Sequence, residues 1–382
     1  MATTNALAKV LGCKTVHSQM KYSFKAKNGK TIVYEYYPWL NTIAIEEASM
    51  LQGSMLPFLD KALRKMKRNN KPFGGVNIIL CADLKQATLG EDLIFSDPYW
   101  DLFKRIEFHI NMRQAGDDEF AARLNRWRDG DIDPVNDLQF FRERQVCPNG
   151  MNYGVVAEHF INLTGDKAII CANQAASDRF NSAVARRLFR AVPLHNVPRS
   201  MVLIRYKDGR RSYMPDPKAG SFCIAINMPV VFTKTVHSSS LPKFEAINGT
   251  VGTVRDFDIN ERGEMQSIDI MLHGVNHTFR HEVFTTLSAD AMTTTTVFSL
   301  DNTFAVTVRK AQGLTLDKII VDTSKGLDMA LGYTAFGRVR EARDLWITHL
   351  PSRDLTKIIS INPHIAEILA MQPLAILEEP QA

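Results

Sequence analysis

The sequence lacks long apolar runs, paired cysteines and a strong charge of either sign, and each absence removes a class of protein. No stretch of the 382 residues approaches membrane-spanning length and the N-terminus has no signal-peptide core, so we expect no membrane partner. The five cysteines never form a Cys-x-x-Cys pair, which disfavours a zinc site and favours free thiols, as in Cys81 and Cys171. Lys plus Arg number 46 against 41 Asp plus Glu, a basic excess compatible with nucleic acid but not diagnostic of it.

We therefore expect the protein in the cytoplasm, in the host cytoplasm if it is viral, or in the nucleus if it is eukaryotic.

Short apolar strands alternate with amphipathic helices, a pattern typical of α/β folds with parallel sheets. The candidate strands are 42–45, 76–81, 168–172, 304–308, 318–322 and 344–349. The clearest helix is 54–68, with one apolar face made of Met55, Leu59, Ala62, Leu63 and Met66.

Composition along the chain predicts two units and an insertion. We expect residues 1–125 to form the first unit and residues 166–382 the second. A polar stretch rich in turn residues, 126–165, connects the two units. From about 229 to 295, β-like runs and turns replace the helices and predict a small inserted β-barrel. Asn28-Gly29 predicts a short hairpin at 19–37.

Two acidic residues, Glu46 and Glu47, follow the first predicted strand. In nucleotide-hydrolysing motors such a strand presents one carboxylate to Mg²⁺ and the next to the attacking water. Acidic pairs after strands more often begin a solvated helix, but Ser49-Met50 completes the Glu-x-Ser-Met form that helicases use.

Three further polar residues lie next to predicted strands: Gln86 and Arg113 follow apolar runs, and Arg338 precedes one. Gln86 follows the second strand, where an amide can orient the lytic water and sense a γ-phosphate. Arg113 and Arg338 stand where a guanidinium can reach across a domain cleft to phosphate, although each would be a surface arginine without its neighbours.

The segment 307–317 carries the strongest pattern. Gly313 allows the backbone to approach a phosphate, and Lys310, Thr307 and Thr315 supply donors for a nucleic-acid backbone.

These segments, in this order, resemble a superfamily 1 helicase of the 5′→3′ branch, the RecD/Dda/PIF group, and most of all its compact phage Dda type. The likeness runs from about residue 2 to residue 350 and includes Ile169–Asn173 and the turn Asn248-Gly249-Thr250. It implies two RecA-like parallel-sheet domains, the first incomplete at its N-terminus, with the β-barrel inserted in the second.

The resemblance also implies roles for the residues. Glu47 corresponds to the catalytic carboxylate, Glu46 to the Mg²⁺ ligand, Gln86 to the γ-phosphate sensor, and Arg113 and Arg338 to the two arginine fingers, with Gly313 near the nucleotide. The residues that fall where the family touches DNA are Thr15, His17, Ser18, Asn173, Thr307, Lys310 and Thr315.

Implied partners are ATP with Mg²⁺, single-stranded DNA and replisome proteins, the chain acting as a monomer in DNA replication, repair or recombination. The chain departs from the family in having Glu46 for Asp and Ala82 for Gly.

The family's Gly-rich phosphate loop is the part that the sequence does not contain. The lone Gly-Lys-Thr, at residues 29–31, has Phe24 where the first glycine belongs and no apolar strand before it. We therefore expect the chain to begin after the strand and helix that hold the loop, as a truncated reading frame, as a split-gene product whose partner chain supplies the loop, or as a decayed helicase. Two functions remain open: an ATP-dependent 5′→3′ DNA helicase, or a non-hydrolysing protein that binds single-stranded DNA or a replisome.

Overall fold

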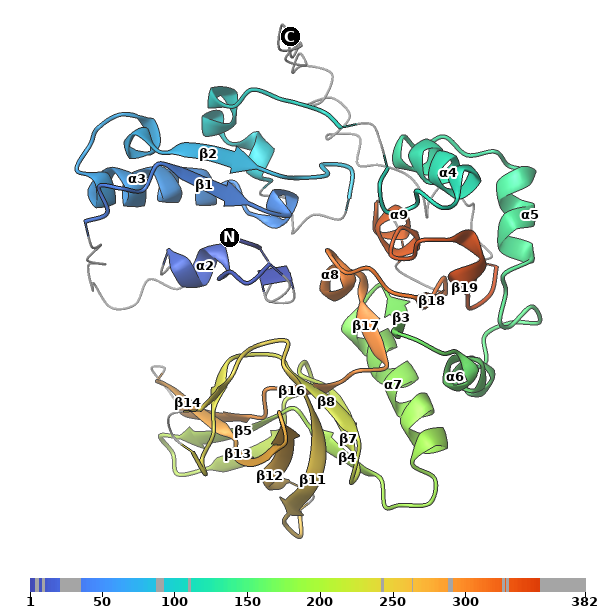
Figure 1. Ribbon diagram of the computed structural model, residues 1–382. Helices are drawn as coiled ribbons and strands as arrows, with labels where there is room; N and C mark the ends of the chain where they lie inside the picture. The colour runs from blue at the N-terminus through green and yellow to red at the C-terminus, as the bar shows by residue number, and fades with distance from the viewer. Residues whose placement is uncertain are drawn as a thin grey trace, which may run out of the picture.

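The computed structural model describes most of the chain (Figure 1). The described residues are 1–3, 7–8, 11–20, 36–86, 93–108, 111–241, 244–262, 264–287, 291–324, 327 and 330–350. The body of the predicted hairpin 19–37, with Gly29-Lys30-Thr31, lies outside them. No helix among the described residues is both long and apolar enough to cross a membrane.

The first unit is built on two parallel strands, β1 (Thr42–Ile45) and β2 (Asn77–Leu80), as the apolar runs predict. Between them runs α3 (Met55–Lys67), whose predicted apolar face is buried beneath the strands. On the other side of β1, Ala2 forms parallel bridges to Glu46 and Thr15. Short helical turns complete the unit: α2 (Val16–Gln19), η1 (Ala48–Met50), η2 (Pro72–Gly75), η3 (Ile94–Ser96) and η4 (Pro98–Leu102).

The second unit is a four-stranded parallel sheet in the order β17-β3-β18-β19. Its strands are Ala305–Thr307, Lys167–Cys171, Lys318–Val321 and Leu345–Ile347, which confirms the four predicted runs. They are almost wholly apolar because helices cover both faces of such a sheet. The helices are α6 (Tyr153–Asn162), α7 (Gln174–Leu188), α8 (Val308–Ala311) and α9 (Leu331–Phe336), with η5 (Ala342–Asp344) before the last strand.

The helices α4 (Asp118–Arg128) and α5 (Asn136–Arg142) belong to the core of this second sheet. Trp127 is fully buried and stacks on Phe141, and both rings contact Phe336 of α9. About half of the stretch predicted as a connecting segment is therefore helical, and its start packs on the unit that follows it in sequence.

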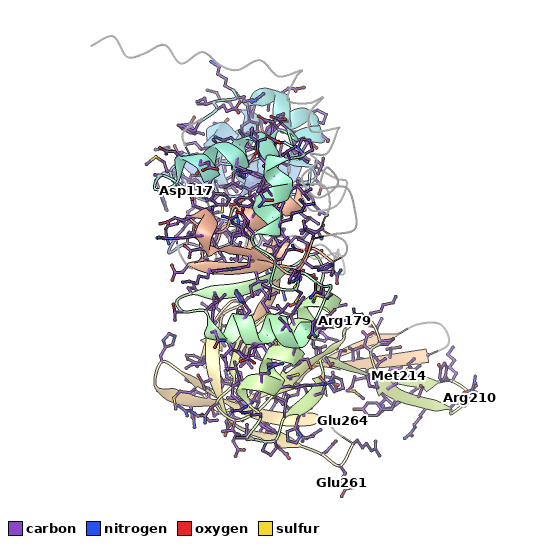
Figure 2. The ribbon with its side chains drawn as sticks, turned by 90° about the vertical axis from the view of Figure 1, so that its right-hand side faces the viewer. Asp117, Arg179, Arg210, Met214, Glu261 and Glu264 are labelled. Carbon is purple, nitrogen blue, oxygen red and sulfur yellow. The ribbon has the colours of Figure 1, made fainter. Side chains whose placement is uncertain are left out.

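The antiparallel region begins at His195, so the predicted insertion at 229–295 covers only part of it. Its strands are β4 (His195–Pro198), β5 (Ser200–Tyr206), β6 (Arg211–Pro215), β7 (Ser221–Ile224), β8 (Pro229–Phe232), β9 (Val236–His237), β10 (Glu245–Ala246), β11 (Val251–Ile259), β12 (Met265–Leu272), β13 (Val275–Arg280), β14 (Glu282–Leu287), β15 (Ala291–Val297) and β16 (Leu300–Asn302). The order β13-β12-β11-β8-β16 forms one sheet and β14-β15-β5-β6 another, which projects outward with Arg210 at its end (Figure 2).

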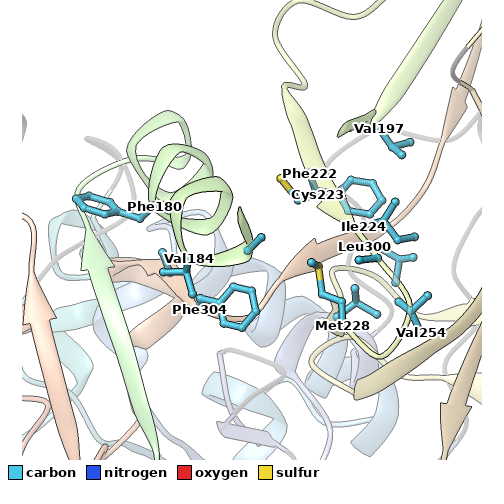
Figure 3. Close-up of a cluster of buried hydrophobic side chains, with 14 of the residues drawn as sticks. Phe180, Val184, Val197, Phe222, Cys223, Ile224, Met228, Val254, Leu300 and Phe304 are labelled. Carbon is cyan, nitrogen blue, oxygen red and sulfur yellow. The ribbon is translucent and has the colours of Figure 1, made fainter. Parts of the chain in front are cut away.

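One continuous apolar cluster joins the antiparallel region to the second α/β unit. Figure 3 shows Val184 of α7 beside Phe304, with Phe180 further along the same helix and Met228 and Leu300 of the antiparallel region on the other side of Phe304. All five side chains are buried, so the insertion is anchored to α7 through packed core.

Candidate functional site

Five of the predicted site residues line a single cleft of about 890 Å³ between the two α/β units. They are Glu46, Glu47, Gln86, Arg113 and Arg338. The first four come from segments beside the first sheet, and Arg338 follows α9 of the second unit. Gly313 is not part of the cleft lining; its φ is +80°, and a Cβ there would lie 3.6 Å from Leu7.

The two carboxylates stand at the carboxyl end of β1, the edge where parallel sheets bind ligands. Glu47 has a φ of 55° and a ψ of 40°, a left-handed conformation that costs a non-glycine residue about 1–2 kcal/mol. Its Oε2 accepts a hydrogen bond of 3.2 Å from Nε2 of Gln312, which is fully buried in the other unit. Strain of this kind is typical of functional positions.

Arg338 is a buried cation without a full set of partners. Its Nε donates to the Thr334 carbonyl oxygen at 2.7 Å and its Nη2 to Oε1 of Gln86 at 3.4 Å. Its Nη1 has no hydrogen-bond partner in the described structure. Burial, and next the charge of Arg113, lower the pKa of Arg338 to about 10. An anion in the cleft would relieve both effects.

Arg113 connects the units directly. Its Nε donates to Oγ1 of Thr315 at 3.1 Å and its Nη1 to the Gly337 carbonyl oxygen at 3.0 Å. Burial lowers its pKa as well, with Glu47 partly offsetting that effect. Thr315, which the family resemblance assigns to DNA, thus holds the guanidinium of Arg113 in this structure.

Asp83 organises a second bridge across the cleft that the sequence reasoning did not identify. Its Oδ2 accepts from the Tyr333 hydroxyl at 3.0 Å and from Nε2 of Gln86 at 3.2 Å, and its Oδ1 lies 3.5 Å from Nε of Arg128. Burial and the charge of Asp83 raise the pKa of Tyr333, so its hydroxyl remains a proton donor. The sequence signal was the carboxylate directly after the second strand.

Three of the predicted DNA contacts are helix N-caps. Thr15 accepts from the backbone N–H of Ser18 at 3.2 Å, Asn173 from that of Ala176 at 3.0 Å, and Thr307 from that of Lys310 at 3.4 Å. Their side chains therefore have a structural use in starting α2, α7 and α8.

His17 and Ser18 lie on α2 and Lys310 lies on α8. Both helices are on the side of the two α/β units that faces the antiparallel sheets (Figure 1). Burial lowers the pKa of His17, which keeps its ring neutral near pH 7. Nζ of Lys310 donates to Oδ2 of Asp301 at 2.9 Å and to Oε1 of Gln174 at 3.0 Å. None of the seven predicted DNA contacts lines the cleft.

Comparisons with known proteins find similar helicases. A family model described as "PIF1-like helicase" matches residues 6–137. The "ATP-dependent DNA helicase PIF1" of Candida albicans is 29% identical over 178 residues, which are 39% of this chain and 20% of that protein. The "ATP-dependent DNA helicase Pif1" of Bdellovibrio bacteriovorus is 22% identical over 368 residues, 90% of this chain and 76% of that protein.

A solved structure of Bacteroides Pif1 with ADP-AlF3 and single-stranded DNA superimposes with a TM-score of 0.66 at 21% identity, covering 97% of this chain and 85% of that one. The chain thus has the fold of these helicases. Its named relatives are PIF1 helicases, which corrects the expected likeness to the Dda type. The chain spans less than half the length of the Candida protein.

Proposed function

We propose that this chain is the motor core of an ATP-dependent 5′→3′ DNA helicase of the PIF1-like family, and that its central cleft is the site of ATP hydrolysis. The observation that carries the proposal is the convergence of two carboxylates, one amide and two guanidiniums from both α/β units on one cleft. Separate units that contribute opposite halves of a phosphate site can couple hydrolysis to their relative movement.

In this proposal Glu47 holds the attacking water and receives its proton. Its hydrogen bond from Gln312 fixes the carboxylate towards the second unit, at the end of the α8 segment. Gln86, placed between Asp83 and Arg338, senses the γ-phosphate. Arg113 and Arg338 bind the charge that develops on the transferred phosphoryl group, the role of arginine fingers.

Mg²⁺ fits the acidic end of β1 only together with a nucleotide. Magnesium at such sites uses one or two carboxylates and completes its shell with substrate phosphates and water. Glu46 is the proposed ligand, and the bound ion would neutralise phosphate charge.

The 382 residues include no phosphate-loop motif of the Walker form. The sequence contains no Gly-x-x-x-x-Gly-Lys-Ser/Thr, and its single Gly-Lys-Thr lies outside the described residues. Backbone N–H groups and a lysine of such a loop form the main electrostatic cradle of a triphosphate. ATP turnover therefore requires that a loop be supplied, and the chain by itself should release phosphate only at background rate.

The second candidate function is a non-hydrolysing protein that binds single-stranded DNA or replisome components. Glu46 and Ala82 favour it, because they replace the residues that the family uses beside Mg²⁺ and the γ-phosphate. An added methylene at the metal ligand displaces its carboxylate, and catalytic geometry tolerates little displacement. Unwinding of a 5′-tailed but not a 3′-tailed duplex by the loop-completed protein would separate the two functions.

We expect the chain alone to bind single-stranded DNA in preference to duplex, with affinity that falls steeply as salt rises. Neutralised phosphates release counterions, so each contact adds about 0.7 to the slope of log affinity against log salt for a single strand. Filter binding of Lys310→Ala should show a slope smaller by about that 0.7. Arg343→Ala, whose side chain is 78% exposed and pairs with Glu341, is the control. An unchanged slope for Lys310→Ala would show that Lys310 does not contact the DNA phosphates.

A further inference from the structure

We propose that Asp301 is a positioning residue for single-stranded DNA: its carboxylate holds the ammonium of Lys310 in place for a phosphate, with Arg199 as the counter-ion of that carboxylate. The inference rests on the proposed function, because it deepens the DNA contact assigned to Lys310. The three residues belong to a charge network at the base of the antiparallel region, and none of them lines the central cleft.

The network lies where the chain enters and leaves the antiparallel region. Arg199 stands between β4 and β5 at the entry, and Asp301 is in β16 at the exit. Gln174 and Asp178 belong to α7, and Lys310 belongs to α8. Contacts within the network therefore join α8 to both ends of the inserted region.

The ammonium of Lys310 is held by two acceptors and keeps one donor for a ligand. Its Nζ donates to Oδ2 of Asp301 at 2.9 Å and to Oε1 of Gln174 at 3.0 Å. An ammonium has three N–H donors, and no third acceptor takes one in the described part of the chain. The Lys310 side chain is 44% exposed, so the third donor is accessible to a phosphate oxygen from solvent.

Asp301 is a rigid acceptor because it is buried and bound on both oxygens. Its side chain is 5% exposed, and its Oδ1 accepts from Nη2 of Arg199 at 2.7 Å and from the backbone N–H of Asn302 at 2.9 Å. Burial acts to raise the pKa of Asp301, but the charges of Arg199 and Lys310 outweigh burial and lower it. The carboxylate that holds Lys310 is therefore ionised at neutral pH.

Arg199 is fixed in its turn by a second carboxylate. Its Nη1 and Nη2 donate to the two carboxylate oxygens of Asp178 at 2.7 and 2.8 Å, the bidentate geometry of strong pairs. Gly220 lies against this pair: its φ is +69°, and a Cβ there would be 2.9 Å from Oδ2 of Asp178. Two cations, Arg199 and Lys310, balance two anions, Asp178 and Asp301, so the network is neutral without DNA.

Positioning explains this arrangement better than stability does. Buried ion pairs add little net stability, and holding a long lysine side chain in one rotamer costs conformational entropy. That cost is offset if a phosphate meets an ammonium already in place, because a preorganised group loses less freedom on binding. Lys310 also stands on the side of α8 where the family resemblance places DNA, beside Thr307.

The test is a double-mutant cycle on the full 382-residue chain, read by the anisotropy of a fluorescein-labelled oligothymidylate. Asp301→Asn removes a negative charge, and that alone would tighten binding to a polyanion. We expect the opposite, an affinity lower by about three- to fivefold, because the released Lys310 samples other rotamers. In the Lys310→Ala background Asp301→Asn should cause no further loss, since no ammonium is left to position.

Gln174→Ala tests the same idea without disturbing a buried charge. It removes the second acceptor of Lys310, so affinity should fall about twofold in the parent and stay unchanged in the Lys310→Ala background. Glu119→Gln neutralises a side chain that is 86% exposed on α4 and is the control for loss of an acidic charge; it should not weaken binding. Circular dichroism and thermal melting check that each variant is folded.

A measurement without DNA shows whether Lys310 is held at all. Acetylation by an N-hydroxysuccinimide ester, followed by mass spectrometry, should modify Lys310 more slowly than the exposed Lys207. Asp301→Asn should bring the two rates together.

Three outcomes would overturn the inference alone: equal rates of acetylation at Lys310 and Lys207 in the parent, tighter binding by Asp301→Asn, or a loss that persists in the Lys310→Ala background. A parent chain that binds no oligothymidylate would instead contradict the DNA binding in the proposed function, and the inference with it.

Discussion

Arg338→Ala should lower the rate of DNA-stimulated ATP hydrolysis by about 10³-fold or more once the chain carries a phosphate-loop segment fused ahead of Ala2. The side chain is only 2% exposed, and its Nη1 has no hydrogen-bond partner among the described residues. Its pKa is lowered because burial and Arg113 both disfavour its charge. Such a preorganised cation gains most when charge develops beside it in the transition state. The effect should fall on kcat, measured by steady-state phosphate release at saturating DNA.

Arg340→Ala is the matched control for that loss. Arg340 is two residues away, 62% exposed, and its Nη1 lies 3.5 Å from Oδ1 of Asp317 at the surface. We expect its kcat to stay close to that of the parent. Arg338→Lys should also be slow because an ammonium lacks the planar fork of a guanidinium. If Arg338→Ala and Arg340→Ala hydrolyse ATP equally fast, Arg338 is no arginine finger.

Asp137→Ala should destabilise the protein by about 3–5 kcal/mol, the cost of leaving buried charges unpaired. The Asp137 carboxylate is fully buried and accepts from Nη2 of Arg126 at 3.0 Å, from Nε1 of Trp127 at 3.0 Å, and from Arg123. It also accepts from the backbone N–H of Asp133 at 2.9 Å, which ties the loop between α4 and α5 to both helices. Urea unfolding followed by circular dichroism measures the loss.

Glu119→Ala provides the comparison, because Glu119 contacts the same Arg123 at 3.2 Å but its side chain is 86% exposed. Exposed pairs contribute little, so its unfolding midpoint should barely move. A loss below about 1 kcal/mol for Asp137→Ala would show that the network contributes no more than one ordinary hydrogen bond.

Local sequence pattern predicted the elements that carry most of the cleft. The parallel strands are short apolar runs, so composition alone marks β1, β2 and β3, and the polar residues after the first two runs mark the sheet edge. The helix α3 was equally readable from its periodicity. The functional roles of Glu46, Glu47 and Gln86 stay predictions until they are measured.

Contacts between residues far apart in the chain could not be predicted from the sequence, because no local pattern encodes them. Gln312 reaches Glu47 across 265 positions of sequence and Tyr333 reaches Asp83 across 250. In the packing of α4 on the second sheet, the ring of Trp127 contacts that of Phe336. The periodicity of the sequence does not predict this contact. The N-cap bonds of Thr15 and Thr307 could have been anticipated, since Thr before a helix is a common cap.

The most direct test of the ATP-site account is phosphate release by the loop-completed fusion, with and without single-stranded DNA, beside its Glu47→Gln variant and the unfused chain. The account predicts hydrolysis that DNA stimulates, that Glu47→Gln abolishes, and that the unfused chain lacks. A fusion that folds and binds ATP but releases phosphate no faster than its Glu47→Gln variant would contradict it and leave the non-hydrolysing DNA-binding protein.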